Sequence, residues 1–332
     1  MTSPAPSPSR NLAPLVSLGH CPDYDRSRVE TAVHKLLAPL GGMGAFVRPG
    51  QRVLLKPNLI VPRPAEAAVT THPEVIRAVA REVLEAGAIP FIGDSPAFSS
   101  TWGVARASGV ATIAQELGIE IVDLGRRPRT RVIDPGGPFE HAPISAAALE
   151  ADAIINLPKI KAHTQMRVSL GSKNLFGCIA GKRKAFFHFR TGPDPIEFGR
   201  MLIALTRYLA PVLTLEDGIV ILERDGPTHG DPRPAGFLAA SADVVAADLA
   251  VLALLGVAPE SVPYLQAARS LKFGPTDLNQ VELAGDPLEA LRVPDFVKVD
   301  ELTSIQFTLG RVIQSISRQM VFLYKAWRQK PS

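Results

Sequence analysis

The sequence predicts an α/β protein with a mostly parallel sheet, helices on both of its faces, and an architecture of βαβ units. Three consecutive apolar residues, Val53 to Leu55, are typical of a strand buried on both faces, as in a parallel sheet. The order strand, helix, strand between residues 52 and 92 is the second indication. The third is the composition, because 46% hydrophobic and 20% charged residues are ordinary for a globular protein.

The individual elements follow from periodicity and from turn residues. Ser27 is expected to cap the first helix and Thr71 the second, which runs to Glu85. Glycines and prolines between residues 126 and 142 indicate a peripheral hairpin, and those between 223 and 232 a long loop. Strands are expected at 15–18, 52–56, 89–92, 119–124, 149–157, 212–215 and 237–240. Helices are expected at 28–38, 73–85, 102–117, 196–209, from 243 onward, and at 259–271.

Charge and cysteine content restrict the partners and cofactors. A net charge of +4 favours small anionic molecules or surfaces as partners. The sequence has no basic stripe interleaved with aromatic residues, so nucleic-acid binding is not expected. Two cysteines, Cys21 and Cys178, cannot form a disulfide framework. They are also too few for a cysteine zinc cage or for a chain-borne iron–sulfur cluster, so neither is expected.

The chain divides into three predicted parts. Residues 1–11 are rich in proline and serine and lack the apolar core of a signal peptide, so a disordered tail is expected. Residues 12–292 form a single α/β core, with two lobes at about 12–150 and 151–292 as the alternative division. Residues 293–332 form an amphipathic helical extension, with a long helix at 305–327. That helix is expected to dock on the core, on a partner or in a homodimer, rather than on a membrane surface.

A cytoplasmic location is predicted. The most apolar run, 244–257, contains Asp248 and is shorter than the roughly 20 residues that a spanning helix needs.

Residues 155–188 contain the densest group of basic and titratable side chains in the chain. Lys159, Lys161 and His163 follow an apolar strand, and a glycine-bounded segment with Lys173 and Asn174 comes next. Basic groups and titratable imidazoles directly after a buried strand favour a docked anion. Because ligands bind at the carboxyl ends of parallel strands, other strand-end residues are expected to join this site. These residues are Lys56, Asn58, Asp94, Ser95 and Asp217.

The order of several segments resembles the domain of unknown function 362 family. The segments are VLLKPN (53–58), TTHPEVIRAVAREVLEAGA (70–88), GDSP (93–96), INLPKIKAH (155–163), GSKNLFGCIAGKRK with a later histidine (171–188), LEDGI (215–219), GPTHG (226–230) and ASADVVAADLAVLALLG (240–256). The resemblance covers roughly residues 16–285 and implies a shared fold and site, while the activity of the family is not generally known. Many members carry an added ferredoxin-like cysteine module. This chain lacks that module, so any electrons would come from elsewhere.

A second, local similarity is to nickel-pincer lactate racemase proteins. It rests on a histidine after a strand, a glycine-lysine turn, a Gly-x-x-x-Gly run and a later histidine. The similarity implies that Lys173 holds the pincer nucleotide, that His188 binds nickel, and that His163 is catalytic. A metal or nucleotide-derived cofactor is implied accordingly, with His163 and His188 as the candidate ligands. Asp94 and Ser95 stand where those proteins have another catalytic histidine.

The predicted site has a catalytic and an anion-binding part. The catalytic residues are His163, His188, Lys173 and Asp217. The anion-binding residues are Lys56, Asn58, Asp94, Ser95, Lys159, Lys161, Asn174 and Lys182. Clustering should lower the pKa of each ammonium, so that one lysine can act as a base or nucleophile. Asp248, in an apolar helix, needs a partner when buried, and one of these lysines is the predicted partner.

Two functions remain open at this stage. The first is an isomerase-like or oxidoreductase-like enzyme that acts on a small carboxylate- or phosphate-bearing metabolite by proton transfer or redox chemistry. The second is a non-catalytic module that binds a cofactor or nucleotide and docks to a partner or membrane through its C-terminal helix. Convergence of His163, Lys173, His188 and Asp217 on one cleft would favour the enzyme. The alternative for each of these residues is a purely structural role.

Overall fold

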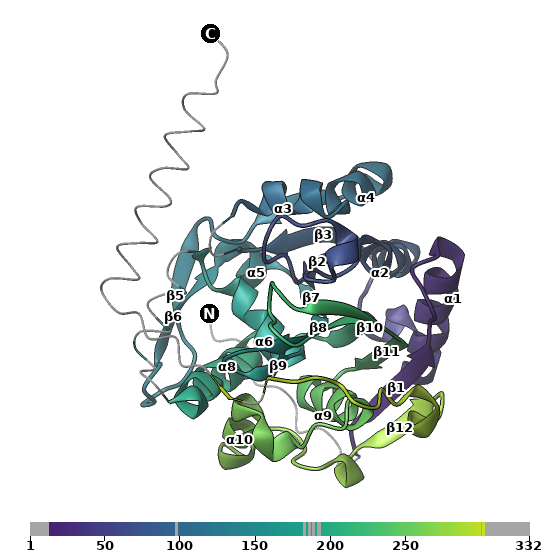
Figure 1. Ribbon diagram of the computed structural model, residues 1–332. Coiled ribbons are helices and arrows are strands. Elements are labelled where there is room, and N and C mark those ends of the chain that lie inside the picture. Colours follow the sequence, from purple (N-terminus) through teal and green to yellow (C-terminus); the bar gives the residue numbers. More distant parts are fainter. Residues whose placement is uncertain are drawn as a thin grey trace, which may run out of the picture.

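The computed structural model describes residues 13–96, 99–181, 184, 187, 190, 194–299 and 301–302. The described residues form a ten-stranded sheet with helices on both faces, together with a separate two-stranded hairpin (Figure 1). The predicted fold class is therefore confirmed. The N-terminal tail and the helix expected at 305–327 lie outside the described residues.

Four neighbouring strands of the sheet run parallel. They lie in the order β7 (Ala153–Leu157), β2 (Arg52–Pro57), β3 (Ile89–Asp94) and β4 (Glu120–Asp123). Their register places Lys56 opposite Asn156 and Asp94 opposite Asp123. Since parallel strands end at the same edge, these polar residues meet at one place in the fold.

The other half of the sheet contains both parallel and antiparallel pairs. It contains β10 (Leu213–Glu223), β11 (Asp231–Ser241), β1 (Leu15–His20) and β12 (Glu282–Gly285), and β8 (Lys159–His163) pairs with β10 and with β9 (Arg167–Ser169). β11 is antiparallel to both β1 and β10, whereas β7 and β8 are parallel to β10.

β10 and β11 are much longer than predicted. Each has eleven residues and together they form a hairpin, so only the ends of the loop expected at 223–232 (Glu223, Asp231 and Pro232) are strand, and residues 224–230 connect the two strands as predicted. Two prolines of β11, Pro232 and Pro234, lie opposite residues of β10. β1 begins to pair with β11 at Phe237, so the prolines lie where a missing N–H breaks no ladder on the second side.

Successive residues of the strands pack alternately into two hydrophobic cores, one on each face of the sheet. Leu54 and Phe91 pack into one core, whereas Leu55 and Ile92 pack into the other. The second core is covered by α1 (Arg26–Leu37), α2 (Pro73–Glu85), α3 (Thr101–Ala107) and α4 (Val110–Leu117). The first is covered by α5 (Ala146–Glu150), α6 (Gly171–Asn174), α8 (Pro195–Leu209), α9 (Val244–Leu254) and α10 (Pro263–Ser270). Burial on both faces explains the continuous apolar runs.

Several predicted helix boundaries are wrong. Asp25, and not Ser27, accepts the capping hydrogen bond of α1, and the ring of His72, and not Thr71, caps α2. The hydroxyl of Thr71 instead donates to the carbonyl of Leu157. The single helix expected at 102–117 is two helices, because Gly109 adopts a φ of 82° between them.

The peripheral hairpin expected at 126–142 is present, as β5 (Pro128–Val132) and β6 (His141–Ser145). At the other end of the chain, the first residues assigned to the C-terminal extension contact the core. Val293 and Phe296 are buried, and the carbonyl of Val299 accepts a hydrogen bond from Arg167.

Candidate functional site

The ends of β2 and β3 place an ion pair at the centre of the site. Lys56 Nζ lies 2.9 Å from Asp94 Oδ1 and donates to the carbonyl oxygen of Pro57 at 2.7 Å. Both side chains are buried. Asp94 also accepts from the backbone N–H groups of Leu59 at 2.6 Å and Ser95 at 2.7 Å. These bonds hold the carboxylate in one orientation.

Lys161 extends the positive charge from β8. Its Nζ donates to Asn58 Oδ1 and to the carbonyl oxygen of Val69, both at 2.7 Å. Asn58 in turn donates to Asn174 Oδ1 at 3.1 Å, and Asn174 donates to the carbonyl oxygen of Lys56 at 2.9 Å. A chain of amide side chains therefore joins β2, β8 and α6 around the lysines.

Lys173 and Lys184 complete the basic group. Nζ of Lys173 lies 5.0 Å from the ring centroid of Phe176, and Nζ of Lys184 lies 5.6 Å from the same centroid. Lys184 also donates to the carbonyl of Ser95, whose hydroxyl accepts from the N–H of Gly181. We call Lys56, Lys161, Lys173 and Lys184 the lysine cluster.

The lysine cluster holds more positive charge than its carboxylate can balance. Within the described residues, Lys56 pairs with Asp94, whereas the other three lysines have no ion pair. Burial, and then neighbouring ammonium groups, lower the pKa of Lys173 to about 7 and the pKa of Lys161 well below its usual value. Burial lowers the pKa of Lys184 to about 8, although Asp94 opposes the shift. Some of these lysines are consequently neutral near physiological pH.

This protonation predicts that the protein becomes more stable between about pH 7 and about pH 8.5. Protonation of a buried lysine destabilises the folded state, and this is why its pKa is depressed there. As the pH rises, the folded protein releases this proton while the unfolded chain still holds it, so the free energy of unfolding increases. Each excess proton on the unfolded chain adds about 1.4 kcal/mol per pH unit to the free energy of unfolding. Urea titrations at both pH values should show the increase, and Lys184→Met should reduce it. Equal stability at the two pH values would contradict the charge assignment.

The window ends near pH 8.5 because the cysteines act in the opposite direction. Burial raises the pKa of the Cys21 and Cys178 thiols to about 11. Above about pH 9 the unfolded chain loses thiol protons that the folded chain keeps, which lowers the free energy of unfolding.

Gly177 packs directly against the Lys56–Asp94 pair. A Cβ at this position would overlap Asp94 Oδ1 and the Nζ of Lys56. Gly177→Ala is therefore expected to lower the free energy of unfolding by about 1–3 kcal/mol, measured by urea denaturation. Gly44→Ala is the matched control, because a Cβ at Gly44 meets no atom within 4 Å. Equal stability of the two variants would show that the ion pair can move aside.

A second polar network lies at the junction of β8 and β10. Lys159 Nζ lies 3.0 Å from Asp217 Oδ2 and donates to the hydroxyl of Tyr24 at 2.6 Å. Tyr24 donates to Asp217 Oδ1 at 2.8 Å and accepts from the N–H of Val220 at 3.1 Å. The ring of His72 stacks on Tyr24 with centroids 3.5 Å apart, and the backbone N–H of His72 donates to Asp217 Oδ2 at 2.9 Å. We call Tyr24, His72, Lys159 and Asp217 the tyrosine network.

Burial sets the protonation of this network. It raises the pKa of Tyr24 well above its usual value, with the charge of Asp217 acting in the same direction. It lowers the pKa of Lys159, and it lowers the pKa of His72 to about 4. His72 is therefore neutral near pH 7. The sequence identified Lys159 and Asp217 but missed Tyr24 and His72, because no local pattern relates these rings to strand ends far away in the chain.

Two buried carboxyl groups, those of Glu216 and Asp248, fix the start of α6. Glu216 and Asp248 both accept from the N–H of Gly171 at 2.8 Å, and Asp248 also accepts from the N–H of Ser172 at 3.1 Å. Burial and the neighbouring charge raise the pKa of Glu216, and burial raises the pKa of Asp248 to about 6. The prediction that Asp248 pairs with a lysine is wrong, since its partners are the backbone N–H groups of Gly171 and Ser172 and the carboxyl group of Glu216.

The predicted histidines are placed only in part. Nδ1 of His163 accepts from the N–H groups of Gln165 at 3.1 Å and Met166 at 3.3 Å, so the neutral ring carries its proton on Nε2. His188 and Lys182 lie outside the described residues. In the described ranges, no three His, Cys, Asp or Glu side chains gather in a way that could hold a metal ion.

The structure thus divides the predicted residues between two groups. Lys56, Asn58, Asp94, Ser95, Lys161, Lys173 and Asn174 share the lysine cluster and its hydrogen bonds. Lys159 and Asp217 belong to the tyrosine network instead. Lys184, which the sequence did not assign to the site, is joined to the cluster. The GKRK run at 181–184 was the signal for a basic residue here, but it could not show which lysine is buried.

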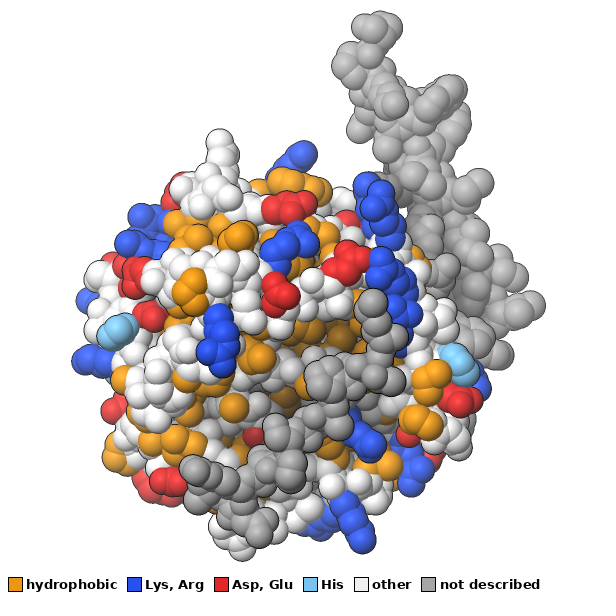
Figure 2. Space-filling view, turned by 180° about the vertical axis from the view of Figure 1, so that it is seen from behind, with side chains coloured by type: hydrophobic (Ala, Val, Ile, Leu, Met, Phe, Trp, Pro, Cys, Tyr) orange, Lys and Arg blue, Asp and Glu red, His pale blue; other side chains and the backbone are white. Residues whose placement is uncertain are grey.

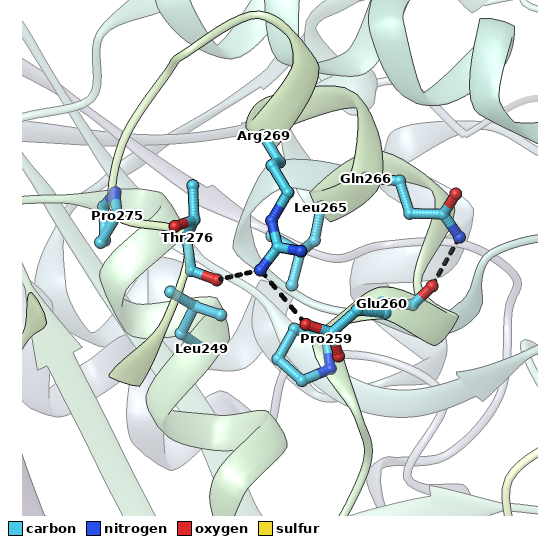
Figure 3. Close-up of a pocket in the computed structure, with 8 residues that line it drawn as sticks. All are labelled: Leu249, Pro259, Glu260, Leu265, Gln266, Arg269, Pro275 and Thr276. Atoms are coloured by element: carbon cyan, nitrogen blue, oxygen red, sulfur yellow. Dashed lines mark hydrogen bonds and ion pairs between the residues drawn. The ribbon is translucent and has the colours of Figure 1, made fainter. Parts of the chain in front are cut away.

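Two surface features lie apart from these groups. An open pocket of about 300 Å³ lies between α9, α10 and the segments around Pro259 and Thr276, where Arg269 pairs with Glu260 at 3.2 Å and donates to the carbonyl of Thr276 (Figure 3). None of its lining residues belongs to the lysine cluster or the tyrosine network. On the face seen in Figure 2, basic and acidic side chains are interspersed. Within the described part of the chain, no helix has the length and apolar character needed to cross a membrane.

Comparisons with known proteins add a family and a relative. A family model described as domain of unknown function (DUF362) matches residues 53–253. The chain is 43% identical over 301 residues to a thylakoid-associated protein of Synechocystis, covering 90% of this chain and 92% of that protein. A solved lactate racemase apoprotein from Thermoanaerobacterium thermosaccharolyticum is 14% identical with a TM-score of 0.46, covering 72% of this chain and 56% of that one.

Proposed function

Because the chain belongs to the DUF362 family, whose description leaves the activity open, we propose a function from the geometry of its own residues. We propose an enzyme that binds a small metabolite through a carboxylate or phosphate group at the lysine cluster. Lys173 then transfers a proton at the carbon next to that group or next to a carbonyl. The observation that supports this proposal is the excess positive charge of three buried or partly buried lysines that have no ion pair in the described residues.

An anion would reverse the balance that now favours neutral lysines. A carboxylate or phosphate within hydrogen-bond distance stabilises the ammonium form and thereby raises the pKa of each lysine that it contacts. Binding should consequently take up protons near neutral pH. It should also weaken as the pH rises through about 8, where Lys173 and Lys184 are neutral in the free protein.

Calorimetric titration with inorganic phosphate and with oxalate, in two buffers of different ionisation enthalpy, tests the binding step. We expect binding with net proton uptake. Lys161→Met should weaken it by about tenfold or more, because a hydrogen bond to a charged group is lost. Lys35→Met, at an exposed position on α1, is the matched control and should leave the affinity unchanged. Absence of binding, or binding without proton uptake, would contradict the proposal.

Proton transfer is tested separately by isotope exchange. The protein is incubated in deuterium oxide with a panel of 2-hydroxy acids, 2-keto acids and sugar phosphates, and carbon-bound hydrogen is followed by NMR. Deuterium should enter next to the carboxylate or carbonyl of one class of compound. The exchange should be lost in Lys173→Met and kept in Lys35→Met. Exchange that survives in Lys173→Met would assign the base elsewhere.

A second candidate function is a module that docks to a membrane without catalysis. It is supported by the name of the Synechocystis relative, which associates that protein with thylakoids. In this chain the apolar stripe predicted at 305–327 would make the contact. Flotation with vesicles of anionic lipid should recover the full chain, and a Leu309→Asp/Val312→Asp variant should stay unbound. Equal recovery of both proteins would argue against this candidate.

A further inference from the structure

Lys173 differs from the other members of the lysine cluster in its surroundings. Its Nζ lies 5.0 Å from the ring centroid of Phe176 and 5.7 Å from that of Phe198. The two rings meet edge to face, with centroids 5.2 Å apart. Lys56, Lys161 and Lys184 each donate to a carbonyl or amide oxygen, whereas Lys173 has no hydrogen bond or ion pair among the residues that the structure describes. Its amine therefore faces aromatic rings and keeps its lone pair available when neutral.

The charges around Lys173 favour the neutral amine. Burial lowers its pKa most, and the ammonium groups of Lys184 and Lys56 lower it further, to about 7. Asp94 opposes this shift, but it is already engaged with Lys56. A lysine in an apolar site beside other cations is the arrangement that makes an amine nucleophilic at neutral pH. Residue 173 is partly exposed, whereas Lys56, Lys161 and Lys184 are buried.

We propose that Lys173 forms an imine with the carbonyl carbon of an aldehyde or keto acid that also carries a carboxylate or phosphate. This inference rests on the proposed function, because the anionic group would bind to the remaining lysines of the cluster. Lys161 is best placed for that contact, since its partners are a neutral amide oxygen and a backbone carbonyl. An anion would add the missing counter-charge without breaking an existing ion pair.

Formation of this imine requires neither a cofactor nor an oxidant. The lone pair of Lys173 Nζ forms a bond to the carbonyl carbon, and the π electrons of the carbonyl move to its oxygen. Lys184, whose pKa is about 8, gives a proton to that oxygen and receives one from the new ammonium. A second proton from Lys184 lets the hydroxyl leave as water. The products are a protonated imine, water and neutral Lys184.

The protonated imine would explain how this site acidifies a neighbouring carbon. It withdraws electrons from the adjacent C–H bond more strongly than the free carbonyl does, so that bond loses its proton more easily. Lys173 would then activate the carbon as an imine while Lys161 binds the anionic group, and the neutral amine of Lys184 would take up the proton and return it.

Reductive trapping tests the inference. The full-length protein is incubated near neutral pH with pyruvate, glyoxylate or pyridoxal phosphate and with cyanoborohydride, and the modified peptides are mapped by mass spectrometry. Lys173 should be modified at least about tenfold more than exposed Lys35. Acetaldehyde, which lacks an anionic group, should not show this preference. Lys173→Arg keeps a cation but has no nucleophilic amine at this pH, and it should abolish the adduct, whereas Lys35→Arg should not.

The outcomes separate this inference from the proposed function. An intact calorimetric response to phosphate, with no adduct at Lys173 for any of the three compounds, overturns the imine and leaves anion binding standing. Modification spread evenly over surface lysines also overturns it. Loss of both phosphate binding and labelling overturns both proposals. Should Lys173→Arg fail to fold, the unmodified protein decides: labelling of Lys173 with a midpoint near pH 7 supports the imine, and labelling that rises only toward pH 10 overturns it.

Discussion

Replacing Asp94 by asparagine is expected to lower the free energy of unfolding by about 3–5 kcal/mol, measured by urea denaturation near neutral pH. Asp94 is buried and is the ion-pair partner of Lys56, while its charge also supports the ammonium forms of Lys161, Lys173 and Lys184. Asp94 accepts from Leu59 through Oδ2 and from Ser95 through Oδ1, whereas asparagine has one acceptor oxygen, so the substitution removes the charge and one of these two hydrogen bonds. The buried ammonium of Lys56 is then left without compensation.

Asp231 provides the matched control for this prediction. Its side chain is 70% exposed and pairs with Arg224 at 3.1 Å, so Asp231→Asn should cost less than about 1 kcal/mol. A double-mutant cycle with Lys56→Met isolates the Lys56–Asp94 interaction, and the combined variant should be more stable than Asp94→Asn alone. Similar losses for Asp94→Asn and Asp231→Asn would mean that water or other groups already screen the buried lysines.

Asp217→Asn is expected to have an effect of similar size, about 3–5 kcal/mol. The carboxylate is completely buried and has three partners, which are Lys159, the hydroxyl of Tyr24 and the N–H of His72. An asparagine can replace only part of this set, because one of its two terminal atoms is a donor and would face another donor. The free energy of unfolding, again from urea denaturation, is the measurement.

The double variant Lys159→Met/Asp217→Leu distinguishes charge from shape. Replacing a whole buried ion pair by apolar residues is often neutral, whereas removing one partner is costly. The double variant should therefore recover much of the stability that Asp217→Asn loses. If it is less stable than Asp217→Asn, the hydrogen bonds to Tyr24 and His72, and not the charge pair, would be the dominant contribution.

Adjacent residues on β10 connect the two groups of the site. Glu216 and Asp217 point to opposite faces of the strand, as successive residues do. Glu216 accepts from the N–H of Gly171 at the start of α6, which carries Lys173, while Asp217 fixes Lys159 and Tyr24. A shift of β10 along its neighbours would consequently disturb the lysine cluster and the tyrosine network together.

The sequence by itself determined the parallel half of the sheet and the residues at its strand ends. Apolar runs such as Val53 to Leu55 identify strands buried on both faces, and strands joined by helices end at one edge. That reasoning correctly brought Lys56 and Asp94 together. It was weakest at β10 and β11, where prolines typical of loops lie in the part of β11 that pairs with β10 but not with β1.

Only the tertiary structure decided how the basic residues are shared. Lys161 and Asn58 are 103 positions apart, Lys159 and Tyr24 are 135 apart, and Tyr24 and Asp217 are 193 apart. Periodicity shows which face of its own element a residue occupies, but it carries no information on the register between distant strands. For the same reason burial, which sets the pKa of Lys173 and Lys184, could not be predicted from a run of lysines. Their depressed pKa values depend on burial and on the neighbouring ammonium groups that the fold brings together.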